Sequence, residues 1–433
     1  MALSELAPRE HATAATAGTS RVGTIDEAVA CLRAAVVPEP ILDVARTLQR
    51  AGHAAVLVGG AVRDVLLGLP ASDWDLATSA RPEEVQGAFR RTVPTGIEHG
   101  TVTVLVRGAD KAIGVEVTTF RGEGAYTDGR RPNEITFLRD LVEDLARRDF
   151  TVNAFAWDPI AFEFTDPFDG LGDLRTATLR AVGDPARRFS EDGLRTMRAV
   201  RLCATRALSL EPATAAAIGG ALHVLAKVSR ERVHVEITKL LGAPVPSRGL
   251  VPMHDTGVWP HVLPALDDDA RAAAIAAVDR LPADPVLRLA RLLAPVARDR
   301  DGITRTLDAL RHGKADRARL NALLGPPGLE LATHDDAIAI RRTAAALGRA
   351  YIDDAIAIAA PDSQRAAGLR AALEGAALDV GELAITGREL IAAGLATPGP
   401  GLGQTLRELL AHVLVQPEDN DRERLLARVR GED

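Results

Sequence analysis

The chain has 433 residues, more than one hydrophobic core normally serves, so two or more domains are expected. Its 47% hydrophobic and 26% charged residues are typical of a globular, soluble protein. The net charge of −7 does not favour a nucleic-acid partner, although in a large protein the local charge of a surface decides such binding. The two cysteines, Cys31 and Cys203, exclude a disulfide framework and favour a cytoplasmic location, and no apolar run approaches the ~18 residues of a membrane span.

Residues 1–39 are predicted to form an N-terminal extension. Met1–Gly23 contains few apolar residues, which predicts disorder, and it lacks the apolar core of a secretory signal. Thr24–Gly52 has a helical pattern that Pro38 and Pro40 interrupt.

A glycine turn follows this helical segment. The apolar run Val56–Val58 ends at Gly59 and Gly60, and a helix-like segment begins there, which predicts strand, turn and helix. Glycines let a bulky anion approach the backbone, and the first turn of a helix offers unpaired N–H groups to a phosphate. The turn is therefore a candidate phosphate site.

Two carboxylates follow the turn closely. Asp73 and Asp75 are two residues apart, so on a strand they point the same way. Mg²⁺ prefers one or two carboxylates together with substrate phosphates, and two such ions can clamp an in-line phosphoryl displacement. The alternative is two surface aspartates beside a turn, but the proximity of the two features favours a metal site.

Further strands are expected at Thr101–Val106, Ile113–Phe120 and Ile135–Leu138. Glu116 lies in the second of these, where it either joins the two aspartates around a metal or pairs with an arginine; both readings stay open. The glycine-rich segment Arg121–Pro132 is predicted to be a flexible loop.

Arg147 and Arg148 precede a helix-like segment in which Asp149 and Asn153 share a face. These groups could hold the ribose and phosphates of a nucleotide, or they could be a charged helix start. Phe164–Asp173 is a cluster of turn-forming residues with three aspartates, which favours a structural turn over the alternative of another metal site.

No strand is expected beyond Pro185. Phe189–Leu208 is predicted to be one helix with Ser190 as its N-cap. Four charged residues recur in it at every third position, namely Asp192, Arg195, Arg198 and Arg201. They form either an ordinary charged helix face or, because three arginines accompany a single acid, a surface for an anionic ligand.

The pair Asp192 and Arg195 supports a sharper hypothesis. Cytosine and adenine both present an amino donor beside a ring-nitrogen acceptor. A carboxylate can accept from the amino group while a guanidinium donates to the ring nitrogen. Guanine and uracil present the opposite pattern, so the pair is a candidate reader of C and A.

The rest of the chain is predicted to be helical. The expected helices are Val228–Leu241 with Ser229 as cap, Val286–Leu293, Ile303–Leu324 with a break at Gly313, His334–Arg349, Tyr351–Ile358, Ser363–Glu374, Gln404–Val415 and Asp421–Val429.

These motifs resemble those of the class II tRNA nucleotidyltransferases, or CCA-adding enzymes, and of the related bacterial poly(A) polymerases of the polymerase β superfamily. The motifs concerned are Gly59-Gly60-x-Val62-Arg63-Asp64 with Asp73-x-Asp75 (metal binding), Arg147 to Ala154 (ribose), Asp166-Pro167-x-Asp169-Gly170 (hinge), Glu191-Asp192-x-x-Arg195 followed by Arg198 and Arg201 (template for CTP and ATP), and Ser229-x-Glu231-Arg232 (neck). Asp169 stands where the family usually has glycine.

The resemblance implies an α+β protein with a small mixed-sheet, polymerase-β-type nucleotidyltransferase head at 40–180. An all-α neck at 181–245 and an all-α body and tail at 246–433 would follow, with strands confined to the head. It also implies the site residues. Asp73 and Asp75 would bind the metal, while the nucleotide would be bound by Gly59, Gly60, Arg63, Arg148, Asp149, Asn153, Asp192, Arg195, Arg198 and Arg201. Glu116 is added to the two aspartates in the catalytic set because of its place in the strand, not because of the resemblance.

The implied activity is template-independent addition of CCA to tRNA 3′ ends, with Mg²⁺ as cofactor, tRNA, CTP and ATP as partners and no membrane; the oligomeric state is not predicted. A CC-adding or A-adding enzyme, a poly(A) polymerase and a catalytically silent RNA-binding protein are the alternatives. The complete Arg121–Pro132 loop favours full CCA addition, since CC-adding members tend to lack it, and the paired aspartates argue against a silent binder.

Overall fold

The computed structural model describes residues 20, 22–71, 73–107, 112–122, 137, 139–264, 266–359 and 363–432. Most of the predicted disordered segment, of the Arg121–Pro132 loop and of the Ile135–Leu138 strand lies outside these residues. The chain forms two compact units, Met1–Leu263 and Pro264–Asp433. Across the described ranges, no helix has the length and apolar character needed to cross a membrane.

The first unit contains a seven-stranded mixed sheet in the order β3-β4-β5-β2-β1-β6-β7. Its strands pair antiparallel except for β2 and β5, which run parallel. The predicted α+β class with a mixed-sheet head is confirmed. The strands are β1 Ala55–Val58, β2 Asp75–Thr78, β3 Thr92–Gly96, β4 Thr101–Arg107, β5 Ala112–Thr119, β6 Ala156–Asp158 and β7 Glu163–Thr165.

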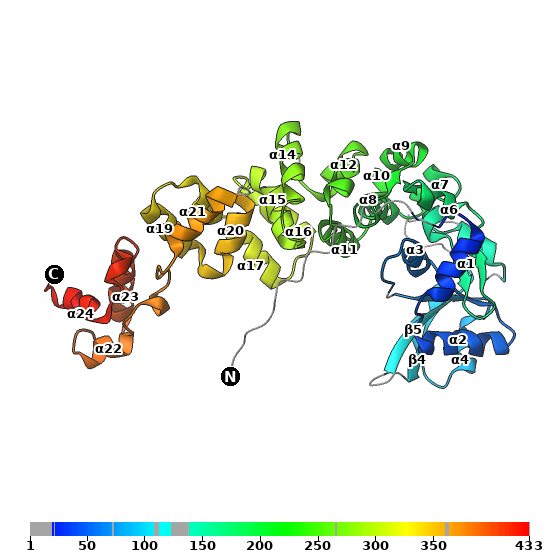
Figure 1. Cartoon of the computed structure of the whole chain (residues 1–433), viewed down its shortest axis with the longest axis horizontal. Coiled ribbons are helices and arrows are strands. Elements are labelled where there is room, and N and C mark those ends of the chain that lie inside the picture. The colour runs from blue at the N-terminus through cyan, green and yellow to red at the C-terminus, as the bar shows by residue number, and fades with distance from the viewer. Residues whose placement is uncertain are drawn as a thin grey trace. The chain divides into compact units, whose positions relative to one another are not determined.

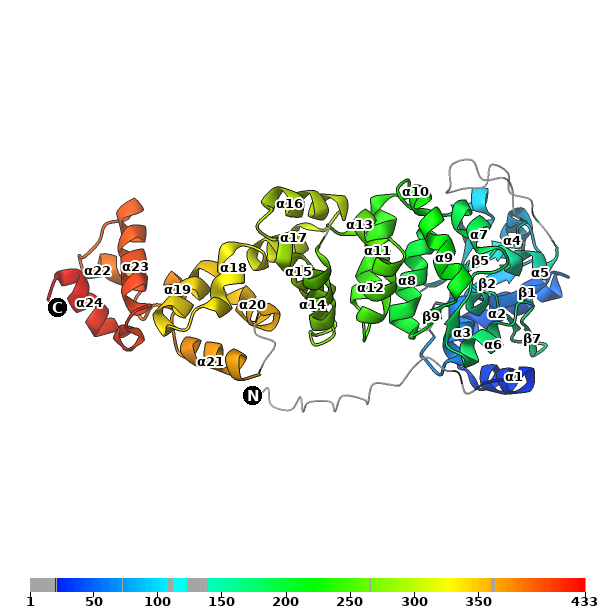
Figure 2. The same cartoon turned by 90° about the horizontal axis from the view of Figure 1, so that it is seen from above.

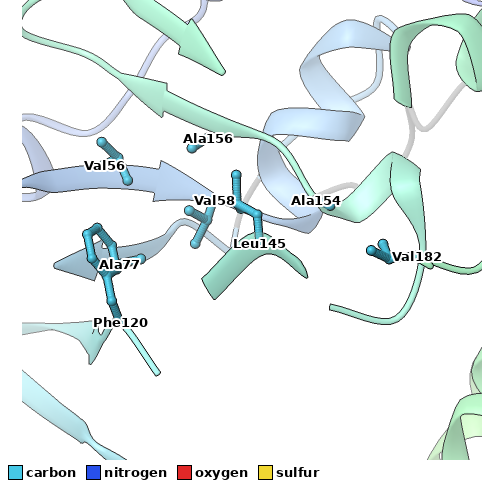
Figure 3. Packing of buried hydrophobic residues seen from close by; sticks show 8 residues of the cluster. All are labelled: Val56, Val58, Ala77, Phe120, Leu145, Ala154, Ala156 and Val182. Atoms are coloured by element: carbon cyan, nitrogen blue, oxygen red, sulfur yellow. The ribbon is translucent and has the colours of Figure 1, made fainter. Parts of the chain in front are cut away.

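The core of this unit surrounds the short strand β1, whose four residues are all buried. Val56 and Val58 lie in a cluster with Phe120, Leu145 and other buried side chains from neighbouring elements (Figure 3). Burial of such side chains stabilises by about 1.5–3 kcal/mol each. The tightly packed strand therefore fixes the position of the glycine turn at its end.

Helices cover the sheet and continue beyond it, with α2 and α4 lying beside β4 and β5 (Figure 1). The helices near the sheet are α1 Ile25–Ala34, α2 Glu39–Arg50, α3 Gly60–Leu66, α4 Pro82–Ala88, α5 Leu141–Ala146 and α6 Gly170–Arg175, with 3₁₀ turns η1 Ile97–His99 and η2 Thr151–Asn153. Helix α1 falls within the predicted extension, yet it contacts α3 and β7, and the Ser20 hydroxyl donates to the Leu66 carbonyl. The described part of the extension thus packs on the head.

The remaining helices of this unit are α7 Pro185–Glu191, α8 Leu194–Arg206, α9 Pro212–Gly220, α10 Leu222–Leu225, α11 Arg230–Leu241, α12 Ser247–Asp255 and α13 Trp259–Val262. Helix α8 packs against both α11 and α12, and the three lie side by side (Figures 1 and 2). The expectation that strands end at Pro185 is wrong in one place. The two-residue strands β8 Thr178–Leu179 and β9 Ser209–Leu210 pair in parallel, so β9 lies within the neck.

The predicted single helix over Phe189–Leu208 is also wrong. Asp192 has extended backbone and separates α7 from α8, and Ser190 lies in the last turn of α7 instead of capping a helix. The break follows from packing at Gly193, where a Cβ atom would lie 2.4 Å from the backbone nitrogen of Leu225. Only glycine lets α10 approach this closely.

The second unit is helical, as predicted, and the expected break near Gly313 separates α16 from α17. Its helices are α14 Asp268–Val278, α15 Pro285–Leu293, α16 Arg300–Ala309, α17 Lys314–Leu323, α18 Pro326–Glu330, α19 Ala337–Leu347, α20 Ile352–Ala359, α21 Ser363–Leu373, α22 Gly387–Ala392, α23 Pro400–Val413 and α24 Arg422–Arg430. Five 3₁₀ turns join them, namely η3 Ala294–Val296, η4 Leu331–Thr333, η5 Arg349–Tyr351, η6 Val380–Glu382 and η7 Pro417–Asp419.

Candidate functional site

An open cavity of about 930 Å³ lies in the first unit between the sheet, the glycine turn and helices α8 and α11. The cavity wall brings together every site residue predicted from the sequence, although they come from segments up to about 140 residues apart. These are Gly59, Gly60, Arg63, Asp73, Asp75, Glu116, Arg148, Asp149, Asn153, Asp192, Arg195, Arg198 and Arg201.

The glycine turn forms one end of the cavity. Gly59 has φ +76°, which favours glycine, and Gly60 begins α3. A Cβ atom at Gly59 would lie 3.0 Å from Nη1 of Arg148, so this guanidinium lies directly against the turn. Burial lowers the pKa of Arg148, and its buried Nε has no hydrogen-bond partner among the described residues. A buried cation with spare donors beside a bare turn suits an anion such as phosphate.

The carboxylates line the adjoining wall. β2 pairs in parallel with β5, with Leu76 opposite Val117, and this register places Asp75 level with Glu116 on the next strand. The protein around the Asp75 carboxyl group displaces water from it and raises its pKa, with further contributions from the charges of Glu116 and Asp73 that the nearby Arg148 opposes. Glu116 is exposed to the cavity and makes no ion pair within the described part of the chain.

This set of carboxylates fits a divalent cation held partly by a substrate. Within the described ranges, no three His, Cys, Asp or Glu side chains lie close enough together to hold an ion by themselves. Mg²⁺ often uses only one or two carboxylates and completes its shell with substrate phosphates and water. Burial is the main cause of the raised pKa of Asp75, and the neighbouring charges of Glu116 and Asp73 add to it; a bound cation would offset this last, like-charge contribution.

Asp149 lies elsewhere on the cavity wall. One of its oxygens accepts from the Asn153 amide at 2.9 Å and the other forms a 2.6 Å ion pair with Arg198. Burial favours a higher pKa for Asp149, but the charge of Arg198 and these hydrogen bonds outweigh it and hold the pKa well below its usual value. The predicted proximity of Asp149 and Asn153 is present, but the 3₁₀ turn η2 produces it instead of an α-helix.

Arg63 is also on this wall, but protein groups occupy its guanidinium. It bonds Asp64 at 2.7 and 2.9 Å and donates to the Asn153 side-chain oxygen, and only 5% of the residue is exposed. Its contact with a triphosphate therefore stays a prediction, whereas its contact with Asn153 shows that it helps to hold the Asp149 wall.

The two candidate base-reading residues do not bond each other. Asp192 accepts from the backbone N–H of Leu194 at 3.0 Å and pairs with Arg232 at 2.8 Å. Arg195 donates to Glu191 at 2.5 Å and to the backbone carbonyls of Arg188 and Arg147 at 2.7 and 3.0 Å. Asp192 precedes α8 and Arg195 lies in its first turn, so both open onto the same end of the cavity.

Several wall residues were missed as site residues in the sequence. They are Asp64, Arg206, Arg232 and Lys239. Glu191 and Glu236, which bind Arg195 and Arg201, were missed as well. Asp64, Glu191 and Arg232 lie inside the motifs quoted above, so the signal was present for them. Arg206 and Lys239 belong to no quoted motif, and only the packing of α8 and α11 brings them to the cavity.

The predicted hinge has a specific local geometry. Asp169 adopts left-handed backbone with φ +55°, which is consistent with glycine as the usual residue in the resembled family. Asp166 accepts from the backbone N–H groups of Gly170 and Leu171, both at 2.9 Å, and so closes the start of α6. The turn from Asp166 to Leu171 is therefore held by hydrogen bonds between its own residues.

Comparison with protein families agrees with this site. Residues 55–180 match the model described as the Poly A polymerase head domain. Residues 207–269 match a model described as a probable RNA- and SrmB-binding site of polymerase A. The first match covers the sheet, the glycine turn and the carboxylates.

Individual relatives match over longer stretches. The CCA-adding enzyme of Limosilactobacillus fermentum is 38% identical over 397 residues, which cover 90% of this chain and 95% of the relative. That of Levilactobacillus brevis is 49% identical over 216 residues, about half of either protein. The crystal structure of the Bacillus stearothermophilus CCA-adding enzyme in complex with CTP is 31% identical and superposes with a TM-score of 0.71 over 92% of this chain and 98% of that one. The chain therefore belongs to the family of CCA-adding enzymes.

Proposed function

We propose that this protein adds C, C and A to the 3′ end of tRNA from CTP and ATP, without a nucleic-acid template and with release of pyrophosphate. The observation that carries the proposal is the convergence of paired carboxylates, a glycine turn and an Asp/Arg reader on one cavity. The 38% identity to a CCA-adding enzyme over 95% of its length and the fold shared with a CTP-bound relative support it.

The triphosphate is assigned to the Gly59-Gly60 turn and to Arg148. The turn leaves room for phosphate oxygens, Nη1 of Arg148 lies against it, and the buried Nε of the same guanidinium has no hydrogen-bond partner among the described residues. Arg63 acts mainly behind this surface, since its bonds to Asp64 and Asn153 keep the wall in place. Charge-assisted bonds of this kind are the strongest available to a side chain and hold the α-phosphate in a fixed position.

The metal site is assigned to Asp73 and Asp75, with Glu116 beside them. Mg²⁺ bound there would lower the charge on the reacting phosphate and favour the ionised 3′ hydroxyl of the RNA. The residues themselves orient the reaction, because the register of β2 and β5 fixes the separation of Asp75 and Glu116. A low pH that protonates Asp75 removes one metal ligand.

The ribose is assigned to Asp149, Asn153 and Arg198. Ion pairing with Arg198 holds the pKa of Asp149 low, so the group stays ionised over the whole physiological pH range. Its oxygens now accept from the Phe150 N–H, Asn153 and Arg198, so a ribose hydroxyl would share or replace one of these bonds.

The base is assigned to Asp192 and Arg195. Three of the five N–H donors of Arg195 bind Glu191 and two backbone carbonyls, which leaves donors for a ring nitrogen while the guanidinium stays in place. Asp192 can still accept from an amino group, since a carboxylate has about four acceptor positions and two are used. A base that presents the opposite pattern leaves these partly buried groups unpaired, at about 1–3 kcal/mol for each.

The domain roles follow the same scheme. We assign nucleotidyl transfer to residues 40–180, base recognition to 181–245 and tRNA binding to 246–433, in a cytoplasmic enzyme. The alternatives are a CC-adding or A-adding enzyme and a poly(A) polymerase, and the match to a poly(A) polymerase head domain keeps the last in view.

One experiment separates these activities. Purified protein is incubated with tRNA lacking one, two or three terminal nucleotides and with CTP, ATP or both. For the tRNA that lacks three nucleotides, CCA addition predicts extension by three residues with both nucleotides and by two with CTP alone. Three other results, each obtained with both nucleotides present, would replace the proposal by the corresponding alternative. They are extension that stops after CC, addition of a final A only, and continued addition of an A tract. D73A serves as the control, since loss of a metal ligand should abolish incorporation in every reaction.

A further inference from the structure

Helix α8 is joined to the head at three points along its length. Near its start, Arg195 donates to the Arg147 carbonyl at 3.0 Å, and in its middle Arg198 pairs with Asp149 at 2.6 Å. At its last residue, Arg206 bonds Asp64 of α3. The first two points belong to the groups assigned above to base and ribose. The third involves no residue assigned to a nucleotide.

The third point is the most tightly built. Arg206 binds both oxygens of Asp64 with two 2.7 Å bonds, the bidentate arrangement that gives an arginine–carboxylate pair its fixed geometry. Asp64 is 8% exposed and also accepts two bonds from Arg63. Asp64 lies in the short helix that begins at Gly60, so this pair joins the end of α8 to the element that carries the glycine turn.

The pair lies far from the reader along the helix. Arg206 follows Arg195 by eleven residues, which is roughly 16 Å at 1.5 Å per residue. A change at this distance cannot remove a base contact directly. Loss of Arg206 acts through the position of α8 relative to the turn, whereas loss of Asp64 also releases Arg63, which donates to Asn153 on the cavity wall.

We propose that Arg206 is a positioning residue for base selection: its bidentate bond to Asp64 fixes the distance between the phosphate-binding turn and the base-reading start of α8. The inference rests on the proposed function. The phosphates are held at Gly59-Gly60 and the base is read at Asp192 and Arg195, so the nucleotide spans the two elements that this pair joins.

Selectivity follows from this rigidity. An incorrect base binds more weakly only while Asp192 and Arg195 are held against it and cannot hydrogen-bond to water instead. If α8 can move away from the turn, a U or G leaves no buried group unpaired. The correct base loses less, because it still gains its hydrogen bonds when α8 returns. Loss of the pair therefore reduces discrimination more than it reduces the reaction with the correct nucleotide.

The test compares R206Q and D64N with R180Q. Arg180 also joins head and neck, through Asp173 at 3.2 Å and Glu211 at 3.5 Å, but it lies outside the cavity wall. The measurement is kcat/KM for CTP and for UTP on tRNA lacking CCA, together with Tm. We expect R206Q and D64N to reduce the CTP/UTP ratio at least tenfold and R180Q to change it less than twofold. R206K keeps the positive charge but cannot form the bidentate bond, so its CTP/UTP ratio should lie between those of R206Q and the wild type.

Two results would overturn the inference. One is an unchanged CTP/UTP ratio in R206Q and D64N. If either variant does not fold, the ratio measured for R206K takes its place. The other is an equal loss of selectivity in R180Q, which would show that any loosening of the neck has this effect. A wild-type protein that does not prefer C and A would overturn the proposed function itself, and the wild-type ratio distinguishes that outcome from the other two.

Discussion

Gly59 shows how one residue can combine backbone geometry with a ligand site. Its φ of +76° and the 3.0 Å approach of Arg148 both require the absence of a side chain. In G59A the new methyl group should displace Arg148 from the turn, and kcat/KM for CTP should fall by about 100-fold, the effect expected from misplacing a reacting group by about 1 Å. G68A is the matched control, because Gly68 has φ +69° with no atom within 4 Å of the new Cβ. Equal losses in both variants would assign the effect to backbone strain alone.

Glu116 offers a test of the carboxylate site through pH. Displaced water raises the pKa of Asp75, Arg148 opposes this, and the charges of Glu116 and Asp73 raise it further. Activity that needs ionised Asp75 is lost as pH falls through this raised pKa. E116Q removes one of the raising charges, so the acid limb of the kcat/KM profile for CTP should move to lower pH. E98Q changes a glutamate outside the cavity and should leave the acid limb in place. An unmoved limb in E116Q would show that the charge of Glu116 does not affect the pKa of Asp75.

At the scale of elements, the hinge turn depends on a glycine that has no room for a methyl group. A Cβ atom at Gly170 would lie 2.5 Å from the Phe155 ring and 2.6 Å from the Thr151 carbonyl oxygen. G170A should lower the free energy of unfolding by about 1–3 kcal/mol, because the backbone of η2 cannot move aside. In G172A the three atoms nearest to the new Cβ belong to the carboxyl group of the exposed Asp169, which can rotate into solvent, so the unfolding of this variant in urea should change little. A similar loss in both variants would contradict this account.

The elements that the sequence predicted well are those with local causes. The β-branched strands around Val104 and Val115 and the helix that ends at Leu241 follow from the periodicity of their side chains. The break at Gly193 could not be predicted, since its cause is the backbone of Leu225, more than thirty residues away. The same limit applies to the site, where motif spacing identified Asp192 and Arg195 but not Arg206 and Lys239, which only the packing of α8 and α11 brings to the cavity.

At the scale of the molecule, the local charge of the cavity differs from that of the chain. The net charge is −7, yet ten cationic side chains and six acidic ones line the cavity wall among the described residues. Such a surface attracts a polyanion in spite of the overall charge, because the field near the wall depends on nearby groups within a Debye length of about 8 Å. The net charge alone therefore indicated the wrong sign for the binding surface.

Lys239 gives this local field a specific test. It is exposed on α11 at the cavity wall, and it is the one cation of that wall without an ion pair or hydrogen bond to another described residue. A free cation on α11, and not on the strands and turn that carry the carboxylates and the glycines, suits a phosphate of the RNA better than one of the nucleotide. K239A should raise KM for tRNA, leave KM for CTP unchanged and reduce the slope of log KM against log salt by about 0.7–0.9, the contribution of one phosphate contact. K227A removes an exposed lysine outside the wall and should change none of these values. If K239A instead raised KM for CTP, Lys239 would belong to the nucleotide site, and the RNA end would have to approach the carboxylates from another side of the cavity.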